Sequence, residues 1–124
     1  SYVEKLVNEG KDVILEIEIQ GALQVKKLYP EALLLFVMPP SADALKERLV
    51  GRGTETPDVI AQRLAISSKE SQYMGGYDYL VINDQIEKSV ENVHAIISCE
   101  HYKTTRNSDT IDMIQQDLKK FEGR

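Results

Sequence analysis

Ala32-Leu33-Leu34-Leu35-Phe36-Val37-Met38-Pro39-Pro40-Ser41 is the stretch that decides the fold. Its first seven residues are all apolar, which is typical of a strand buried on both faces of a parallel sheet. The two prolines end the strand, because proline cannot donate the next hydrogen bond of the sheet. Ser41 predicts a helix N-cap. We therefore expect a strand over 32–38 and a helix from Ser41 to about Val50.

Strands and helices alternate on both sides of this stretch. Upstream, Val13–Ile19 is apolar and rich in β-branched side chains, which predicts a strand over 12–19. Downstream, Tyr79–Ile82 predicts a third strand. Apolar spacing and capping residues predict further helices over 2–9, 20–28, 56–71, 86–101 and after the polar segment 104–109. This alternation predicts an α/β fold with a parallel sheet.

The composition is that of a single acidic domain. The chain has 124 residues, a formal net charge of −5 and a pI near 5.0, which argues against broad nucleic-acid binding. Cys99 is the only cysteine, which excludes a disulfide framework or a cysteine zinc site within one chain and favours a reducing, cytoplasmic location. No apolar run approaches the roughly 20 residues of a membrane span. The chain opens without an initiator methionine, and we interpret it as a fragment.

Three arginines lie in or near a glycine-rich loop of this acidic chain. The loop is Gly51-Arg52-Gly53-Thr54-Glu55, and Thr56 predicts the cap of the next helix. Arg48 lies one helical turn before Arg52, and Arg63 lies on the following helix. Arginine binds phosphate oxygens through a planar fork, so we interpret the segment as a mobile loop that closes over a polyphosphate. The alternative is a solvated, salt-bridged face with the acidic partners Glu47, Glu55 and Asp58.

Two acidic residues lie near the carboxyl end of the strand expected over 12–19. Glu16 and Glu18 are two residues apart, so on a strand both side chains point to one face. A parallel strand covered by helices is normally apolar, and ligands of open α/β sheets bind at the carboxyl ends of strands. The pair therefore suggests a site for a metal-bound phosphate or the edge of a base. The alternative is an edge strand with one solvated face.

Asn83 and Asp84 directly follow the strand expected over 79–82 and precede a helix. Either side chain could cap that helix by accepting a hydrogen bond from a free backbone N–H. The same position, at the top of the sheet, also suits contact with a purine base. The nearby tyrosines are interpreted as packing residues rather than a stacking surface: Tyr73, Tyr77 and Tyr79.

Five stretches of the chain occur in an order and at a spacing that together point to one protein family. They are Gly10–Ala22 (GKDVILEIEIQGA), Met38–Ser41 (MPPS), Leu45–Thr56 (LKERLVGRGTET), Gln62–Leu64 (QRL) and Tyr77–Asp84 (YDYLVIND). Over roughly residues 1–103 the chain thereby resembles guanylate kinase, with the bacterial enzymes closest in style. The resemblance implies ATP-dependent phosphorylation of GMP to GDP with Mg²⁺. It also implies a P-loop kinase-type parallel sheet with flanking helices and a helical lid.

The resemblance assigns roles by position. Arg52 and Arg63 match the lid arginines that contact the transferring phosphate, and Arg48 matches their support at the lid's base. A cis arginine fits this chemistry, because phosphoryl transfer needs charge neutralisation on the transferring oxygens. The nucleotide-binding positions are Glu18 and Glu16 on the guanine side and Asn83, followed by Asp84, on the adenine side.

The resemblance also implies parts that these 124 residues do not contain. No G-x-x-x-x-G-K-[ST] motif occurs, and the tyrosine- and arginine-rich GMP-binding region is absent. We expect a partial core over 1–44, a lid over 45–72, and the rest of the core with carboxyl-terminal helices over 73–124. The central P-loop strand is missing from this sheet, which leaves two unpaired edges.

Several consequences follow for partners. We expect GMP and ATP as ligands, and neither nucleic acid nor membrane. Alone, the chain should be inactive, or be stabilised by a homo-oligomer or a complementing chain that fills the sheet. The alternative function is a non-catalytic guanylate-kinase-like module that binds proteins. Such modules usually lose lid arginines, so the arginines kept here favour the enzyme.

Overall fold

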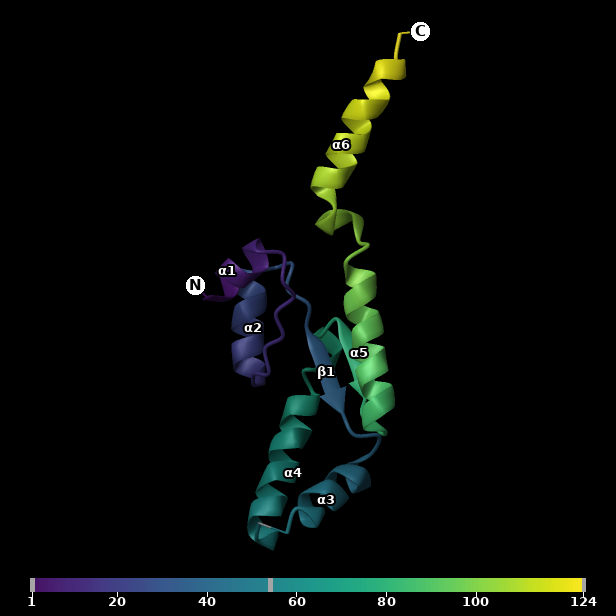
Figure 1. Cartoon of the computed structure of the whole chain (residues 1–124). Helices are drawn as coiled ribbons and strands as arrows, with labels where there is room; N and C mark the ends of the chain where they lie inside the picture. The colour runs from purple at the N-terminus through teal and green to yellow at the C-terminus, as the bar shows by residue number, and fades with distance from the viewer. Residues whose placement is uncertain (1, 54, 124) are drawn as a thin grey trace. The chain divides into compact units, whose positions relative to one another are not determined.

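The computed structural model describes residues 2–53 and 55–123 and has an α/β fold (Figure 1). Two compact units make up the chain, Ser1–Phe36 with Thr56–Tyr79 and Val37–Glu55 with Leu80–Arg124. The elements are α1 (Tyr2–Asn8), α2 (Ile19–Leu28), β1 (Leu35–Met38), α3 (Ala42–Gly51), α4 (Pro57–Ser71), β2 (Tyr79–Ile82), α5 (Ile86–Glu100) and α6 (Ser108–Leu118). Short 3₁₀ turns complete the described part: η1 (Met74–Gly76), η2 (Thr104–Arg106) and η3 (Lys119–Phe121).

β1 and β2 are hydrogen-bonded neighbours in a two-stranded sheet within the described residues. Leu34 O accepts from Asp78 N (2.9 Å) and Tyr79 N (3.1 Å) before the strands, and Met38 O accepts from Asn83 N (2.7 Å) at their carboxyl ends. The two strands therefore run parallel. The connection between them contains α3 and α4, as a parallel pair requires. The predicted α/β class is confirmed.

The strand expected over 12–19 is not formed, and that prediction is wrong. Residues 11–18 have no regular secondary structure, and Ile19 already belongs to α2. Ile14 is 75% exposed. A β-branched run makes a strand only where a neighbouring strand accepts and donates its backbone hydrogen bonds. The sheet that the structure describes contains only β1 and β2, so this segment has no strand to pair with.

The helices follow the sequence prediction closely. Ser41 Oγ accepts a hydrogen bond from Ala44 N (3.0 Å) at the start of α3, and Thr56 Oγ1 accepts from Val59 N (3.4 Å) at the start of α4. Both predicted N-caps are therefore confirmed. The remaining predicted helices over 2–9, 20–28 and 86–101 correspond to α1, α2 and α5 within one residue.

The first unit has a small apolar core. Its buried side chains are Ile19, Ala22 and Leu34. The ring of Tyr77 meets that of Phe36 edge to face, with 4.9 Å between centroids. Burial is the main cause that raises the pKa of Tyr77. The interpretation of Tyr77 as a packing residue is confirmed.

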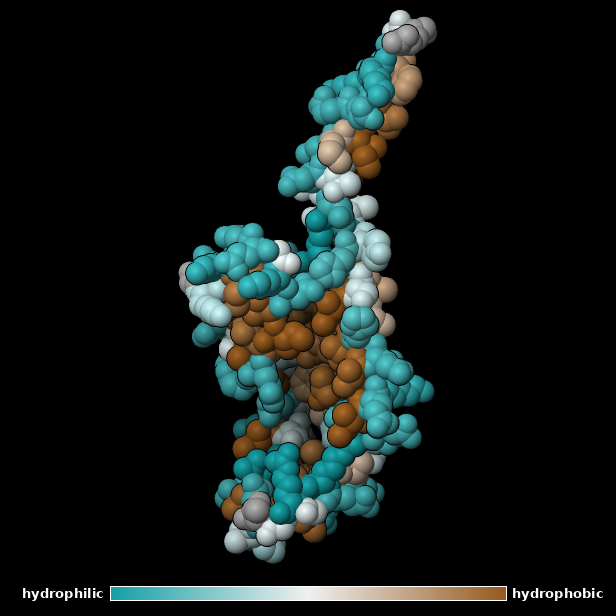
Figure 2. Space-filling model, in the orientation of Figure 1, coloured by the Kyte–Doolittle hydropathy of each residue, from teal (hydrophilic) through white to brown (hydrophobic). Residues whose placement is uncertain are grey.

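In the second unit, the strand residues of β2 bury one face. Val81 is 3% exposed, whereas its neighbours Leu80 and Ile82 on the other face of β2 are exposed. Val37 of β1 is 49% exposed, although the register of the two strands places it beside Val81 and not on the face of Leu80 and Ile82. The expectation that the strand over 32–38 is buried on both faces is therefore wrong, because Val37 itself is exposed. Apolar side chains are visible on the surface of the chain in Figure 2.

Candidate functional site

Arg48 joins the end of α3 to the segment that follows β2. It lies in the last turn of α3, where a positive side chain interacts favourably with the helix dipole. Its Nη2 donates to Asn83 O at 2.5 Å and approaches Asp84 O at 3.4 Å. Both carbonyls lie at the carboxyl end of β2, which is the edge of an open α/β sheet where ligands bind.

Arg52 is the C-cap residue of α3 and is exposed. Among the residues that the structure describes, its guanidinium has no hydrogen-bond or ion-pair partner. Gly53 follows with φ +65°, a backbone conformation that L side chains rarely adopt. The chain therefore turns directly after Arg52, as the glycines predicted. Thr54 of the predicted loop lies outside the described residues, and the mobility of the loop stays a prediction.

Arg63 is an exposed residue of α4. It belongs to the first compact unit, whereas Arg48 and Arg52 belong to the second. The convergence of the three arginines on one phosphate therefore stays a prediction. The alternative of a salt-bridged face does not hold for Arg48, whose described partners are the two backbone carbonyls rather than carboxylates.

Asn83 is held at the ends of both strands. Its backbone N–H donates to Met38 O (2.7 Å), and its side-chain Oδ1 accepts from Ser89 Oγ (3.0 Å). The N-cap of α5 is Gln85, which makes no capping hydrogen bond with its side chain. The interpretation of Asn83 or Asp84 as the helix cap is therefore wrong. The contact with the base edge, which was the other interpretation, stays a prediction.

A polar hollow of about 270 Å³ opens beside Asp84. It is lined by Ile82, Asp84, Gln85, Lys88 and Asn92. Typical ligand pockets have volumes of about 300–1,000 Å³ and are mostly apolar. The hollow lies just below this size range, and its lining is mixed, with the apolar Ile82 beside the polar side chains. It provides carboxylate, amide and ammonium groups next to the carbonyls that Arg48 binds.

Glu18 caps α2, a role that the sequence did not suggest. Its carboxylate accepts from Gln20 N at 2.9 Å and from Gly21 N at 2.6 Å. A Cβ on Gly21 would lie 3.0 Å from Glu18 Oε1, so glycine leaves room for the cap. Glu16 is exposed and precedes the helix. Because 12–19 is not a strand, the argument that both side chains share a strand face no longer applies, and their contact with guanine stays a prediction.

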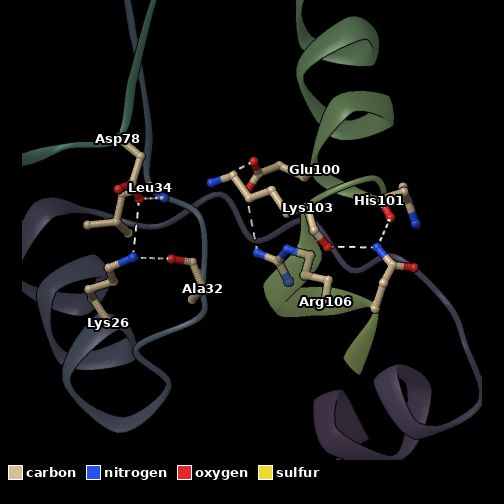
Figure 3. Close-up of polar contacts among 9 residues, drawn as sticks. Lys26, Ala32, Leu34, Asp78, Glu100, His101, Lys103 and Arg106 are labelled. Carbon is tan, nitrogen blue, oxygen red and sulfur yellow. Dashed lines mark hydrogen bonds and ion pairs between the residues drawn. The ribbon is translucent and has the colours of Figure 1, made fainter. Parts of the chain in front are cut away.

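Asp78 organises the first unit, and sequence reasoning missed it. Figure 3 shows its carboxylate accepting from Leu34 N (2.8 Å) and from Lys26 Nζ (3.3 Å). Lys26 Nζ also donates to Ala32 O at 2.5 Å. These bonds connect α2, the start of β1 and the start of β2. Asp78 was visible only as part of the YDYLVIND stretch, and nothing in the sequence identified its partners.

Glu100 is the buried charged residue of the described chain, at the end of α5. Its carboxylate contacts Lys103 Nζ (2.9 Å) and Arg106 Nη2 (3.4 Å), as Figure 3 shows. The hydrogen bond from Lys103 is the main cause that lowers the pKa of Glu100. Asn107 Nδ2 donates to the carbonyls of His101 (2.8 Å) and Lys103 (2.7 Å) and so fixes the turn that leads to α6.

In residues 2–53 and 55–123, no group of three or more His, Cys, Asp or Glu side chains is placed to hold a metal ion. None of the helices in the described ranges is long and apolar enough to span a membrane.

The family model and the most similar curated proteins point to the same family. The guanylate kinase family model matches residues 1–100. The chain is 54% identical over 105 residues to guanylate kinase from Bacillus cereus strain ZK / E33L, which covers 85% of this chain and 51% of that protein. It is 49% identical over 106 residues to guanylate kinase from Streptococcus agalactiae serotype III, with 86% and 51% covered.

A solved structure agrees with these sequence matches. Guanylate kinase from Anaplasma phagocytophilum superposes with a TM-score of 0.69 at 29% identity. The match covers 83% of this chain and 48% of that one. The chain thus spans about half the length of the curated relatives it matches.

Proposed function

The chain belongs to the guanylate kinase family, and on that basis we propose that it supplies the lid and part of the nucleotide-binding core for the reaction ATP + GMP → ADP + GDP. Because it spans about half of its relatives, the proposal concerns the whole enzyme. In this proposal, residues 1–44 are a partial core, 45–72 the lid, and 73–124 the rest of the core with the carboxyl-terminal helices.

The contrast between Arg48 and Arg52 is the observation that carries the proposal. Arg48 is fixed on the carbonyls of Asn83 and Asp84. Arg52, one turn later, is exposed and has no partner among the described residues, directly before the turn at Gly53. One arginine anchored at the base and one available to bind is what a lid over phosphate oxygens requires.

Arg52 and Arg63 are proposed to bind the oxygens of the phosphoryl group in transfer. Their forked guanidinium groups would neutralise the charge that is spread over these oxygens, and this effect is largest in a closed site without water. Arg48 is proposed to position α3 against the segment after β2. This role does not require Arg48 itself to touch phosphate.

Two separate pairs of residues are proposed to bind the bases of the two nucleotides. Glu18 accepts two backbone hydrogen bonds, and an ionised carboxylate has about four acceptor positions, so it keeps capacity for the N–H groups of guanine. Glu16, which is exposed, is proposed as its neighbour on the same nucleotide. Asn83 and Asp84 are proposed on the adenine side, because they follow β2 and adjoin the polar hollow.

Mg²⁺ is proposed as the companion of ATP. The described residues do not fit a protein-held magnesium site, because no three acidic or other ligating side chains lie together. Magnesium commonly keeps few protein ligands and is bound largely by substrate phosphates. No step of the proposed reaction is therefore assigned to a metal held by these residues.

We propose GMP and ATP as the partners, a cytoplasmic location, and no role for nucleic acid or membrane. Alone, the 124-residue chain is proposed to be inactive, or to need a second copy or a complementing chain against its open sheet face. The exposed side chains of Leu80 and Ile82, on one face of β2, support this need. A non-catalytic, protein-binding module remains the second candidate, and the presence of all three arginines argues against it.

A chimera tests the proposed role of the lid. The segment of the Bacillus cereus enzyme upstream of the matched region is fused to Ser1, and kcat for GDP formation is measured. Arg52→Ala is expected to lower kcat by about 10³-fold, as loss of an arginine finger does. Lys46→Ala removes an exposed cation from the same helix and should leave kcat within about twofold. Equal effects of the two substitutions would refute the role of Arg52.

A further inference from the structure

Ser89 lies in α5 and makes a hydrogen bond that the proposed function does not use. Its Oγ donates to Asn83 Oδ1 at 3.0 Å, and both side chains are half-buried. A serine hydroxyl inside a helix often bonds the carbonyl four residues earlier, which here is that of Gln85. Within the described ranges, this hydroxyl instead has Asn83 Oδ1 as its one partner. The hydroxyl therefore gives its hydrogen to the residue that is proposed to lie beside adenine.

Three elements hold Asn83 by three of its polar groups. Its N–H donates to Met38 O of β1 (2.7 Å), and its carbonyl accepts from Arg48 Nη2 of α3 (2.5 Å). Its side-chain oxygen accepts from Ser89 of α5. All four residues belong to the second compact unit. The amide nitrogen Nδ2 makes no hydrogen bond with the residues that the structure describes, so its two hydrogens are left for a ligand.

The bond from Ser89 fixes which way the amide of Asn83 faces. Oδ1 accepts the hydroxyl hydrogen only while Nδ2 is turned away from Ser89. An amide oxygen has two lone pairs, so Oδ1 keeps one acceptor position besides this bond. The amide therefore presents a donor and an acceptor side by side in a fixed order. Without the hydroxyl, a half-turn about the last side-chain bond would exchange the two groups.

This order matters because adenine and guanine present different orders to an amide. Adenine has ring-nitrogen acceptors on both sides of its N6 amino donor, so an amide binds it with Nδ2 on a ring nitrogen and Oδ1 on the amino group. Guanine has the acceptor O6 in place of that amino group, next to the donor N1–H. The same amide after a half-turn matches O6 and N1–H. An amide that is free to turn can thus bind either base, whereas a fixed amide discriminates between them.

We propose that Ser89 is a positioning residue that selects adenine over guanine in the phosphate donor, by fixing the order of Nδ2 and Oδ1 of Asn83. The inference rests on the proposed function, in which Asn83 lies on the adenine side, and it adds a determinant of the donor nucleotide. Ser89 acts through Asn83 and does not itself touch the base. Its removal should change the preference between two purine nucleotides, whereas loss of a purely structural contact would weaken the binding of both alike.

Equilibrium titration with unreactive nucleotides measures this preference without turnover. The chimera with the upstream segment of the Bacillus cereus enzyme is saturated with GMP, so that only the donor site is read. Kd is then measured for the β,γ-imido analogues of ATP and GTP, and the parent chimera should bind the ATP analogue more tightly. Ser89→Ala should reduce the ratio of the two Kd values by about tenfold, because a bidentate contact between an amide and a base gives discrimination of about that size.

Three further variants separate the hydroxyl from general changes in α5. Ser89→Thr keeps a hydroxyl at the same position and should keep the ratio within about twofold of the parent. Ser98→Ala removes another half-buried hydroxyl from the same helix and should leave the ratio unchanged. Asn83→Ala removes the amide itself and should lower the ratio at least as far as Ser89→Ala does.

The same titrations distinguish failure of this inference from failure of the proposed function. The role of Ser89 alone is overturned if Asn83→Ala lowers the ratio and Ser89→Ala does not, or if Ser89→Ala weakens the binding of both analogues equally. A parent chimera that binds both analogues equally well also overturns it. An unchanged ratio with Asn83→Ala, or no saturable binding of the ATP analogue to the folded parent chimera, overturns the proposed adenine side of the site and the inference with it.

Discussion

Replacing Arg48 with methionine should loosen the base of the proposed lid. The substitution keeps a long unbranched side chain but removes the donor that reaches Asn83 O at 2.5 Å and Asp84 O at 3.4 Å. The longer contact is near the limit of a hydrogen bond, so we count only the shorter one. A hydrogen bond that involves a charged group contributes about 1.5–3 kcal/mol, and because Arg48 is exposed we expect a loss at or below the lower end, about 1–1.5 kcal/mol.

Urea unfolding of the 124-residue chain, followed by circular dichroism, measures this loss as a lower midpoint at unchanged slope. For a chain of this size the same loss lowers Tm by about 3–6 °C. Arg52→Met is the matched control, because it removes the same group one turn later, where it has no partner among the described residues. Its cost should stay within about 0.5 kcal/mol. Arg48→Lys keeps the positive charge but lacks the forked guanidinium group, so its loss of unfolding free energy should lie between those of Arg48→Met and Arg52→Met.

Equal losses for Arg48→Met and Arg52→Met would contradict the reasoning. They would show that the contacts with the two carbonyls contribute nothing beyond the removal of a surface charge. The anchored base of the lid, and with it the contrast between Arg48 and Arg52, would then lose its physical support.

Two further substitutions test the other polar contacts. Glu18→Ala should cost about 1 kcal/mol in urea unfolding, because α2 loses its N-cap, whereas Glu16→Ala should cost less than about 0.5 kcal/mol; equal costs would contradict the cap. The hydrogen bond from Lys103, and then the charges of Lys103 and Arg106, lower the pKa of Glu100 from its ordinary 4.5 against the opposing effect of burial. The ionised Glu100 carboxylate therefore stabilises the folded chain fully above pH 4.5. This stabilisation is lost as the pH falls through the lowered pKa of Glu100 in the folded state. Glu100→Gln should remove this part of the acid dependence, and an unchanged dependence of the urea midpoint on pH would show that the ion pairs do not contribute.

Features determined by neighbouring residues were predictable from the sequence. Pro39-Pro40 marks the end of β1, and Ser41 and Thr56 cap the helices that they precede. These signals act over three or four residues, so no knowledge of the rest of the fold is needed. The turn at Gly53 was predictable for the same reason, because its positive φ is a local requirement.

Features that depend on distant partners were not predictable. The apolar run at 12–19 has the composition of a strand, but a strand also needs a neighbour, and no described strand pairs with it. The partners of Arg48 are backbone carbonyls 35 and 36 residues away, and every residue has such a carbonyl. No side-chain pattern could have pointed to that contact.

Two polar residues have roles that their residue types do not indicate. Glu18 acts as an N-cap, a position where Asp, Asn, Ser and Thr are preferred, so its spacing to Gly21 does not predict a cap. Asn83 was an ordinary cap candidate, but Ser89 occupies its side-chain oxygen and α5 begins only at Ile86. Capping preference alone cannot identify which residue starts the helix.

GDP formation shows whether these 124 residues are the lid and partial core of a guanylate kinase. GMP, ATP and Mg²⁺ are added to the purified 124-residue chain and, separately, to the chimera that adds the upstream segment of the Bacillus cereus enzyme. We expect no GDP from the chain alone and sustained GDP formation by the chimera that depends on Arg52. GDP formed by the chain alone, or a folded chimera that forms none, would overturn the proposed function.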